Sequence, residues 1–477
     1  MADGLFHGYE PVGFCEVFGP QGPRPHYAQL ESRLDTLDAP EMAARSDLVG
    51  SILRRQGITF NVYGNQEGIE RTWPLDLLPR IIPADEWDHL ERGLAQRVRA
   101  LDLFLDDLYV GERSAIREGV IPGWLVESSP GYVREAIGIQ VPGARCVVSG
   151  IDLVRDAEGV YRVLEDNLRV PSGVSYVLEN RAAMTRVMGS AFEPYRVRGV
   201  HHYGASLLRT LRELAPQHLS EPTVVVLSPG VFNSAYFEHV FLARQMGVEL
   251  VEGRDLVVDD GRIHMRTTRG LQQVDVIYRR VGDEAIDPVV FQPDSLLGVP
   301  GLMSVIRSGM VSVANAIGNG VIDDKALYPF VPGLIRHYLG ADPVIPNVTT
   351  YLPWEPDQLE AILGRLDELV VKPATESGGY GIVIGPAATS AELDVVAERL
   401  RADPRGFIAQ ETIQLSTHPT WTDTGLRARH IDLRPFVLQG QTVEVLPGGL
   451  TRVALREGSL IVNSSQGGGS KDTWVLA

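Results

Sequence analysis

The stretch Val-Leu-Glu-Asp-Asn-Leu-Arg-Val-Pro-Ser-Gly at residues 163–173 joins the end of an apolar strand to a cluster of polar side chains and turn residues. Two apolar runs, 146–154 and 160–164, flank the turn-like residues 155–159, and this pattern predicts a β-hairpin. Because side chains alternate along a strand, Glu165 and Asn167 are expected on one face and Asp166 on the other.

Three side chains of this hairpin are candidate metal ligands. Asp152 lies on the first predicted strand, and Glu165 and Asn167 lie at the end of the second. Oxygen ligands from two adjacent strands suit a magnesium ion that also keeps phosphate and water ligands. Taken singly, each of them is as well explained by a solvated strand face. An arginine, Pro171 and Gly173 follow directly. Turn-forming residues directly after three candidate ligands favour a metal site over a solvated strand face.

Length and composition exclude several classes of protein. A chain of 477 residues with 44% apolar and 22% charged residues is typical of globular proteins with roughly two to four domains. The net charge of -17 disfavours nucleic acid and anionic membranes as partners. Cys15 and Cys146 cannot build a disulfide framework or a zinc motif, and no apolar run is long enough for a membrane span. A cytoplasmic protein is expected, and oligomer formation is left open.

The middle of the chain predicts a separate small sheet. A long amphipathic helix is expected over residues 84–109. Strands at 223–228, 248–251 and 274–278, with a helix at 234–246, then indicate a parallel sheet. The predicted divisions are 1–194, 195–320 and 321–477. A predicted strand ends in Arg279 and Arg280. These side chains either bind the carboxylate or phosphate of a ligand or are simply solvated at the end of the strand.

The third region carries two lysines and a glycine-rich loop. Asp323 is a candidate N-cap of a helix with Lys325 in its first turn, and Lys372 lies on a strand at 368–373. The glycines that follow allow the backbone to approach a phosphate, although a glycine-rich loop alone is weak evidence. Combined with a strand lysine, the loop predicts a mobile hairpin that closes over a triphosphate; its glycines are Gly378, Gly379 and Gly381.

A further apolar strand, residues 406–413, ends in Gln410 and Glu411. These residues could hold an adenine edge and a ribose, or the strand could be an ordinary edge strand. Three strands near 430–437, 442–446 and 450–455 follow, and they bear Asp432, Arg434 and Arg452.

Together these features are the components of an ATP-grasp fold in a changed order. The metal carboxylates precede the lysines and the glycine loop here, which implies a circular permutation. The sequence resembles the circularly permuted ATP-grasp proteins related to glutathionylspermidine synthase, a family often described by two adjoining domains of unknown function. The matching stretches are residues 57–63, 164–169, 323–325, 371–373, 447–452 and 463–474.

The resemblance implies a circularly permuted ATP-grasp fold of the α+β or α/β class with a small parallel-sheet domain, and ATP and magnesium as cofactors. The implied magnesium ligands are Asp152, Glu165 and Asn167, and the phosphate-binding lysines are Lys325 and Lys372. Gln410 and Glu411 would line the adenine and ribose pocket under a lid that contains residues 378–381. Where the synthase pattern has an arginine two positions before the first aspartate, this chain has Gly150, so the substrate-side arginine is expected among Arg169, Arg434 and Arg452.

The resulting hypothesis is an ATP-dependent carboxylate–amine ligase that works through an acyl phosphate. Two alternatives are a nucleotide-binding protein whose catalysis has decayed and a kinase that stops at phosphoryl transfer. The substrates, a small-molecule or peptide carboxylate and an amine, are not specified by the residues, because function depends on sites and not on folds.

Overall fold

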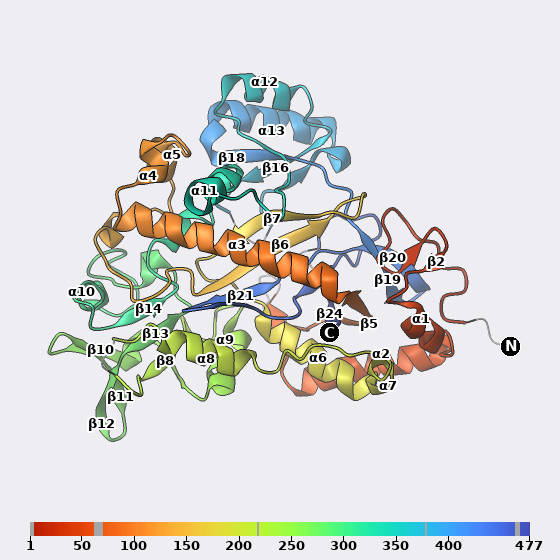
Figure 1. The fold of residues 1–477 in the computed structure, drawn as a ribbon, viewed down its shortest axis with the longest axis horizontal. Helices are drawn as coiled ribbons and strands as arrows, with labels where there is room; N and C mark the ends of the chain where they lie inside the picture. The colour runs from red at the N-terminus through yellow and green to blue at the C-terminus, as the bar shows by residue number, and fades with distance from the viewer. Residues whose placement is uncertain (1–3, 62–69, 217–218, 377–378, 463–467) are drawn as a thin grey trace.

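The computed structural model describes residues 4–61, 70–216, 219–376, 379–462 and 468–477. Its N-terminal part lies at one end of the molecule, beside the hairpin of β19 (Thr417–Thr422) and β20 (Gly425–His430) (Figure 1). The elements of this part are β1 (Phe18–Gly19), β2 (Gly22–Pro23), α1 (Ala28–Leu34), α2 (Ala39–Arg55), β3 (Thr59–Asn61) and β4 (Glu70–Thr72).

The predicted hairpin forms one half of a four-stranded sheet, with its second strand at the edge. Its strands are β6 (Val148–Arg155) and β7 (Tyr161–Asn167), and the sheet order is β22-β21-β6-β7 with β21 (Phe436–Gln439) and β22 (Val443–Val445). Helix α3 (Ala84–Tyr109) runs across this sheet (Figure 1), and its apolar face packs against Ile151 and Leu153 in the main core. The 84–109 helix predicted from periodicity is confirmed.

Helix α6 (Val174–Val187) continues from the hairpin, and α7 (Gly189–Phe192) follows it. Two short helices, α4 (Ser114–Arg117) and α5 (Gly123–Glu127), connect α3 to β6.

The small parallel sheet is confirmed, with the order β14-β13-β8-β9 and every pair parallel. Its strands are β8 (Val224–Leu227), β9 (Glu249–Val251), β13 (Val276–Arg279) and β14 (Ser312–Ala314). Its helices are α8 (Tyr203–Arg212), α9 (Tyr236–Met246) and α10 (Leu302–Arg307). An antiparallel meander extends from it at one corner of the molecule (Figure 1), formed by β10 (Leu256–Asp259), β11 (Arg262–Thr267) and β12 (Gly270–Val274).

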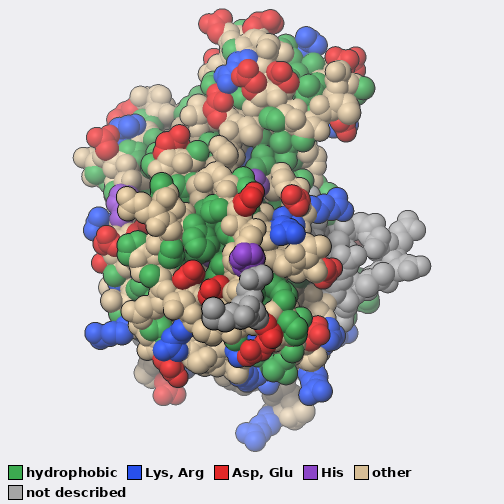
Figure 2. Space-filling model, turned by 90° about the vertical axis from the view of Figure 1, so that its right-hand side faces the viewer, with side chains coloured by type: hydrophobic (Ala, Val, Ile, Leu, Met, Phe, Trp, Pro, Cys, Tyr) green, Lys and Arg blue, Asp and Glu red, His purple; other side chains and the backbone are tan. Residues whose placement is uncertain are grey.

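A third four-stranded sheet forms a lobe at the top of Figure 1, and we call this lobe the lid. The lid comprises β15 (Thr350–Tyr351), α12 (Pro356–Leu363), β16 (Leu369–Pro373), β17 (Val383–Ile384), α13 (Ser390–Ala402) and β18 (Phe407–Glu411). Its sheet is antiparallel in the order β15-β18-β16-β17, and it has a core of its own that includes Leu369, Val396 and Leu400. Figure 2 shows the lid standing above the rest of the molecule, with acidic and basic side chains interspersed over it.

The end of the chain returns to its beginning. After β19 (Thr417–Thr422) and β20 (Gly425–His430), strands β23 (Thr451–Val453) and β24 (Gly469–Val475) form a sheet with β5 (Leu75–Ile82), and β24 runs parallel to β5. Likewise, β21 pairs with β6, so both sheets combine strands from the two ends of the chain. This pairing is what a permuted order of elements requires.

Three expectations need correction. Asp323 does not cap a helix, since residues 323–327 form turns and the next α-helix is α11 (Val331–Leu339). The 406–413 strand is not an edge strand, because β18 lies between β15 and β16. The loop expected over residues 463–471 lies partly outside the described residues, and from Gly469 the chain is already strand β24. Among the described residues no helix combines the length and hydropathy needed to cross a membrane.

Candidate active site

The hairpin β6–β7 places the predicted ligands opposite one another. Asp152 is in register with Glu165, and Gly150 is in register with Asn167. Asp166 points to the opposite face, where Arg97 of α3 donates to both its carboxylate oxygens at 2.6 Å. The alternation predicted from the sequence is therefore confirmed, and it separates a structural carboxylate, Asp166, from those that face the lid.

Asp152 lies in a buried cluster of two carboxylates and two arginines. Arg434 donates to both of its oxygens, from Nε at 2.5 Å and from Nη2 at 2.8 Å, and Arg452 donates from Nη2 at 2.7 Å. Arg452 also donates to Asp432. Burial raises the pKa of Asp152, but the two guanidinium groups outweigh burial and hold that pKa well below its usual range. Asp152 is thus a carboxylate with both oxygens occupied.

Arg434 passes beside Gly150 on its way to Asp152. A Cβ atom at Gly150 would make a tight contact of 3.2 Å with Cβ of Pro171 and ordinary contacts of 3.4 and 3.6 Å with Cδ and Cγ of Arg434. Of the three candidate substrate-side arginines, Arg434 and Arg452 therefore meet at the hairpin.

Glu165 and Asn167 have free coordination capacity. The nearest cations to the Glu165 carboxylate are Lys325 Nζ at 3.7 Å and Arg434 Nη2 at 3.8 Å, both too long for strong hydrogen bonds. Asn167 Nδ2 lies 3.4 Å from Glu165 Oε1. No cluster of three or more His, Cys, Asp or Glu side chains placed to hold a metal exists within the described ranges. The oxygen donors that fit magnesium here are Glu165 and Asn167.

The two candidate lysines converge on Glu165 from the lid side. Lys325 Nζ donates to the backbone oxygen of Glu376 at 2.6 Å, and its backbone N–H donates to Ala374. Lys372 is buried on β16, and its ammonium group has no hydrogen bond or ion pair within the part of the chain that the structure describes. Burial is the main cause that lowers the pKa of Lys372 to about 8; Lys325 lowers it further, and Glu165 opposes the shift.

The glycine-rich loop connects β16 to β17, which pair as an antiparallel hairpin. Gly379 and Gly381 have φ angles of 80° and 69°, in the left-handed region that favours glycine. Gly379 faces the cavity beneath the lid. Gly378 lies outside the described residues.

Gln410 and Glu411 of β18 differ in their pairing. The buried Gln410 donates from Nε2 to Thr350 Oγ1 at 3.0 Å, and its Oε1 has no partner in the described structure. Both oxygens of Glu411 are occupied, by the Tyr351 hydroxyl at 2.6 Å and by Arg365 at 3.1 Å. Gln410 is therefore the residue of this pair with an unused polar atom.

A cavity of about 150 Å³ between the lid and the hairpin brings most of these residues together. Its polar lining includes Asp152, Glu165, Lys372, Gln410 and Arg452. Its apolar lining comes from both sides and includes Val154, Leu164, Val370, Ile382, Ile384, Ile413, Leu415, Leu460, Ile461 and Val462. The cavity therefore combines a largely apolar lining with carboxylates, a lysine and an arginine.

Several candidates lie elsewhere. The Arg169 side chain is 3.8 Å from Glu284 and does not line the cavity. The guanidinium groups of Arg279 and Arg280 are buried, so they are not a solvated strand end, and both pair with internal groups, although Arg280 Nε has no partner in the described structure. Arg279 donates to the backbone oxygens of residues 281, 315 and 316, and Arg280 pairs with Glu238 and the oxygen of Pro171.

Sequence reasoning missed three contributors. Asp323 accepts hydrogen bonds from the backbone N–H groups of Leu168 and Arg169, so it fixes the turn after β7, and burial raises its pKa to about 6. Asp432 anchors Arg452, and residues 460–462 line the cavity. The apolar run Leu-Ile-Val at 460–462 was visible in the sequence, whereas the partners of Asp323 and Asp432 were not.

This chain belongs to the circularly permuted ATP-grasp family, type 2, which it matches over residues 79–454. The family expected from the sequence is confirmed, and so is the fold class.

Relatives and a solved structure agree with this placement. The chain is 52% identical over 472 residues to an uncharacterized protein of Synechocystis sp., covering 98% of each. It is 44% identical over 476 residues to a Frankia alni protein with the provisional name glutamate–cysteine ligase 2-3, covering 99% of this chain and 54% of that protein. The fold is similar to that of a glutathione synthetase-like effector from Globodera pallida, with a TM-score of 0.59 and 12% identity over 92% of this chain and 98% of that one.

Proposed function

We propose that this chain is an ATP- and Mg²⁺-dependent ligase that joins a carboxylate to an amine through an acyl phosphate. The observation that carries the proposal is the cavity between the lid and the hairpin, whose largely apolar lining also includes Lys372, Glu165 and Arg452. An adenine ring would contact the apolar side chains, and a triphosphate would lie near the charged ones. The name of the Frankia relative supports a ligase, although the matched part is about half of that protein.

The charges of two lysines support phosphate binding. The unpaired Lys372 ammonium and Lys325 together offer two positive charges where a triphosphate would lie. Electrostatic positioning of this kind is the main contribution of proteins to phosphoryl transfer. Gln410 Oε1, a buried acceptor without a partner, would accept a hydrogen bond from the adenine amino group.

Glu165 and Asn167 would hold magnesium, which supplies neutralisation of phosphate charge when bound. Asp152 would join them only after Arg434 moves, because both its oxygens are occupied. Arg452 Nη1 makes no hydrogen bond within the described residues. In this proposal it would donate a hydrogen bond to the acceptor carboxylate or to the transferred phosphate.

The proposed reaction has two steps. A carboxylate oxygen attacks the γ-phosphorus of ATP, ADP leaves, and an acyl phosphate forms. The amine nitrogen then attacks the carbonyl carbon, the bond to the phosphate oxygen breaks, and the amine loses a proton. Gly379 and the loop around it would limit water access to the acyl phosphate. No residue of the chain is covalently modified.

The test is ADP release with paired substrates, beginning with glutamate and cysteine because of the name of the Frankia relative. ADP release that needs both a carboxylate and an amine, an amide product in the mass spectrum and a hydroxamate when hydroxylamine replaces the amine would support the proposal. A stable phosphorylated product with no need for an amine would identify a kinase. ATP binding without turnover across the panel would identify a binding protein. Lys372→Met serves as the inactive control.

A further inference from the structure

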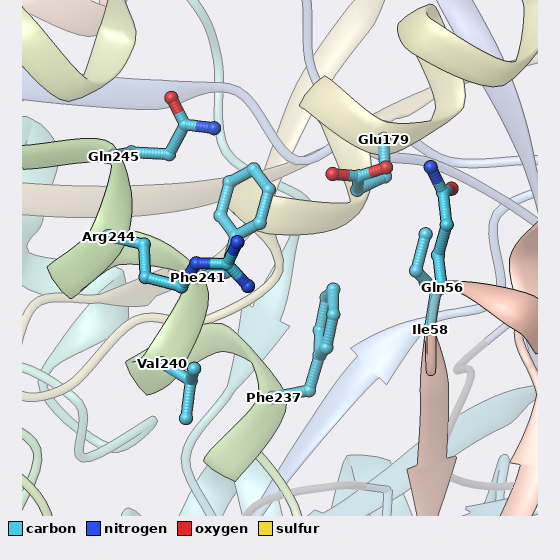
Figure 3. Close-up of a pocket in the computed structure, with 8 residues that line it drawn as sticks. All are labelled: Gln56, Ile58, Glu179, Phe237, Val240, Phe241, Arg244 and Gln245. Carbon is cyan, nitrogen blue, oxygen red and sulfur yellow. The ribbon is translucent and has the colours of Figure 1, made fainter.

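A second cavity lies away from the lid, between α6, α9 and the chain that leaves α2. It has a volume of about 580 Å³, within the range of small-molecule sites. Figure 3 shows Glu179 from α6 and Arg244 from α9 reaching into the same space. The cavity shares no lining residue with the one beneath the lid.

One wall of this cavity is aromatic and held by stacking. Phe237 and Phe241 line it, with ring centroids 5.9 Å apart. Behind them Tyr176 stacks on Phe237 at 5.8 Å and on Trp73 at 3.7 Å, so the wall continues into a buried column. Such a wall is pre-formed, and it presents aromatic surface to a ligand at little entropic cost.

Among the described residues, the polar side chains of the cavity make no hydrogen bond or ion pair with another side chain. Burial raises the pKa of the half-buried Glu179 carboxylate, and the charge of Arg186 opposes this shift. The guanidinium group of Arg244 and the amides of Gln56 and Gln245 likewise have no side-chain partner in that part of the chain. By contrast Arg181, also on α6, is fully engaged with Asp472 and Thr473. Unpartnered charges of opposite sign in one cavity indicate a ligand that carries both.

We propose that this cavity binds an amino acid with an aromatic or large aliphatic side chain, or a peptide of two or three such residues. The ligand's ammonium group pairs with Glu179, its carboxylate pairs with Arg244, and its apolar side chain packs on Phe237 and Phe241 (Figure 3). Glu179 is half-buried and Arg244 is exposed, and charge-assisted hydrogen bonds are stronger than those between neutral groups. The proposal is independent of the ligase proposal, because none of these residues lines the nucleotide cavity.

The test measures binding of four probes by calorimetry in the absence of nucleotide. L-phenylalanine and phenylalanyl-glycine carry both charges, phenylalaninamide lacks the carboxylate, and N-acetyl-phenylalanine lacks the ammonium group. The expected result is binding of the first two and at least about tenfold weaker binding of the others, since one charged hydrogen bond contributes about 1.5–3 kcal/mol. Equal binding of phenylalanine and its amide would overturn the proposal, and so would no binding of any probe.

Variants assign the binding to the cavity. Glu179→Gln keeps the shape of the side chain and is expected to weaken phenylalanine binding about 10- to 100-fold, as is Arg244→Gln. The matched controls, Glu398→Gln and Arg266→Gln, change exposed side chains on α13 and β11 and should bind as the wild type does. ATP affinity should be unchanged in Glu179→Gln. If both control and test variants bind equally, the cavity is not the site.

Discussion

Two buried lysines of this chain have opposite surroundings. Lys471 on β24 is fully buried, and its ammonium group donates to the Asp76 carboxylate and to the backbone oxygens of Leu78 and Pro419. Lys372 on β16 is buried almost as deeply, but it faces a cavity and has no such partner among the described residues. Lys471 therefore holds strands together, whereas Lys372 is a charge that still lacks its counter-ion.

The comparison shows what separates structural from functional charge in this fold. Burial is the main cause that lowers the pKa of both ammonium groups. What differs is whether the protein itself supplies the compensating groups. The same criterion assigns Arg279 to the structure and Gln410 and Glu179 to candidate sites.

The largest expected effect is on stability. Lys471→Met should lower the free energy of unfolding by about 3–5 kcal/mol, because Asp76 is left buried without its partner. Urea denaturation followed by circular dichroism measures this. Lys372→Met is the matched control and should unfold at the same urea concentration as the wild type or higher, since it removes an unpaired buried charge. An equal loss of unfolding free energy in the two variants would contradict the distinction between a structural and a functional lysine.

Lys372→Met should instead weaken ATP binding roughly 10- to 100-fold, because a charged contact with a phosphate oxygen contributes about 1.5–3 kcal/mol. Titration calorimetry at fixed magnesium measures the affinity. A Lys372→Met protein that binds ATP as tightly as the wild type would show that the lysine does not contact the nucleotide.

The affinity for ATP should also depend on pH through Lys372. Its pKa is about 8 in the free protein, and only the protonated ammonium pairs with phosphate, so ATP binding raises this pKa and takes up a proton. Affinity is therefore full below pH 8 and falls by up to about tenfold per pH unit as the pH rises above it. The decline should be absent in Lys372→Met, and a decline that persists there would come from another group.

The smallest expected effect concerns the base. Gln410→Leu removes the unpaired acceptor and should reduce the preference for ATP over GTP by about 0.5–1.5 kcal/mol, roughly 3- to 10-fold. Competition binding of the two nucleotides measures it. Gln439→Leu is a matched control, because Gln439 is a buried glutamine with an unpaired Oε1 that lies on β21 and does not line the cavity. A change of preference in both variants would argue against a base contact.

Much of this architecture could be predicted from the sequence, because its signals are local. The period of apolar residues gave helix α3, and the turn between two apolar runs gave the hairpin. What could not be predicted depends on long-range partners. Arg434 and Arg452 are 282 and 300 residues from Asp152, and Lys471 is 395 residues from Asp76. Asp323 was wrongly predicted to cap a helix for the same reason. The backbone N–H groups that bind its carboxylate belong to residues about 155 positions earlier, which the local sequence does not reveal.

The candidate site shows the same limit. The residue types at Glu165, Asn167, Lys325 and Lys372 indicated magnesium and phosphate, and the structure brings these four side chains close together. The sequence could not show that Arg434 and Arg452 occupy both oxygens of Asp152. Their role in catalysis stays a prediction, as does that of Arg169.

The central claim is that the lid and the hairpin bind magnesium-ATP between them. Its most direct test is calorimetric titration of ATP with and without magnesium, on the wild type and on Glu165→Gln. The account predicts that magnesium strengthens ATP binding to the wild type and that the variant loses most of that gain while it still binds ATP without magnesium. An equal gain in both proteins would contradict the assignment of Glu165, and no ATP binding to the wild type would contradict the claim itself.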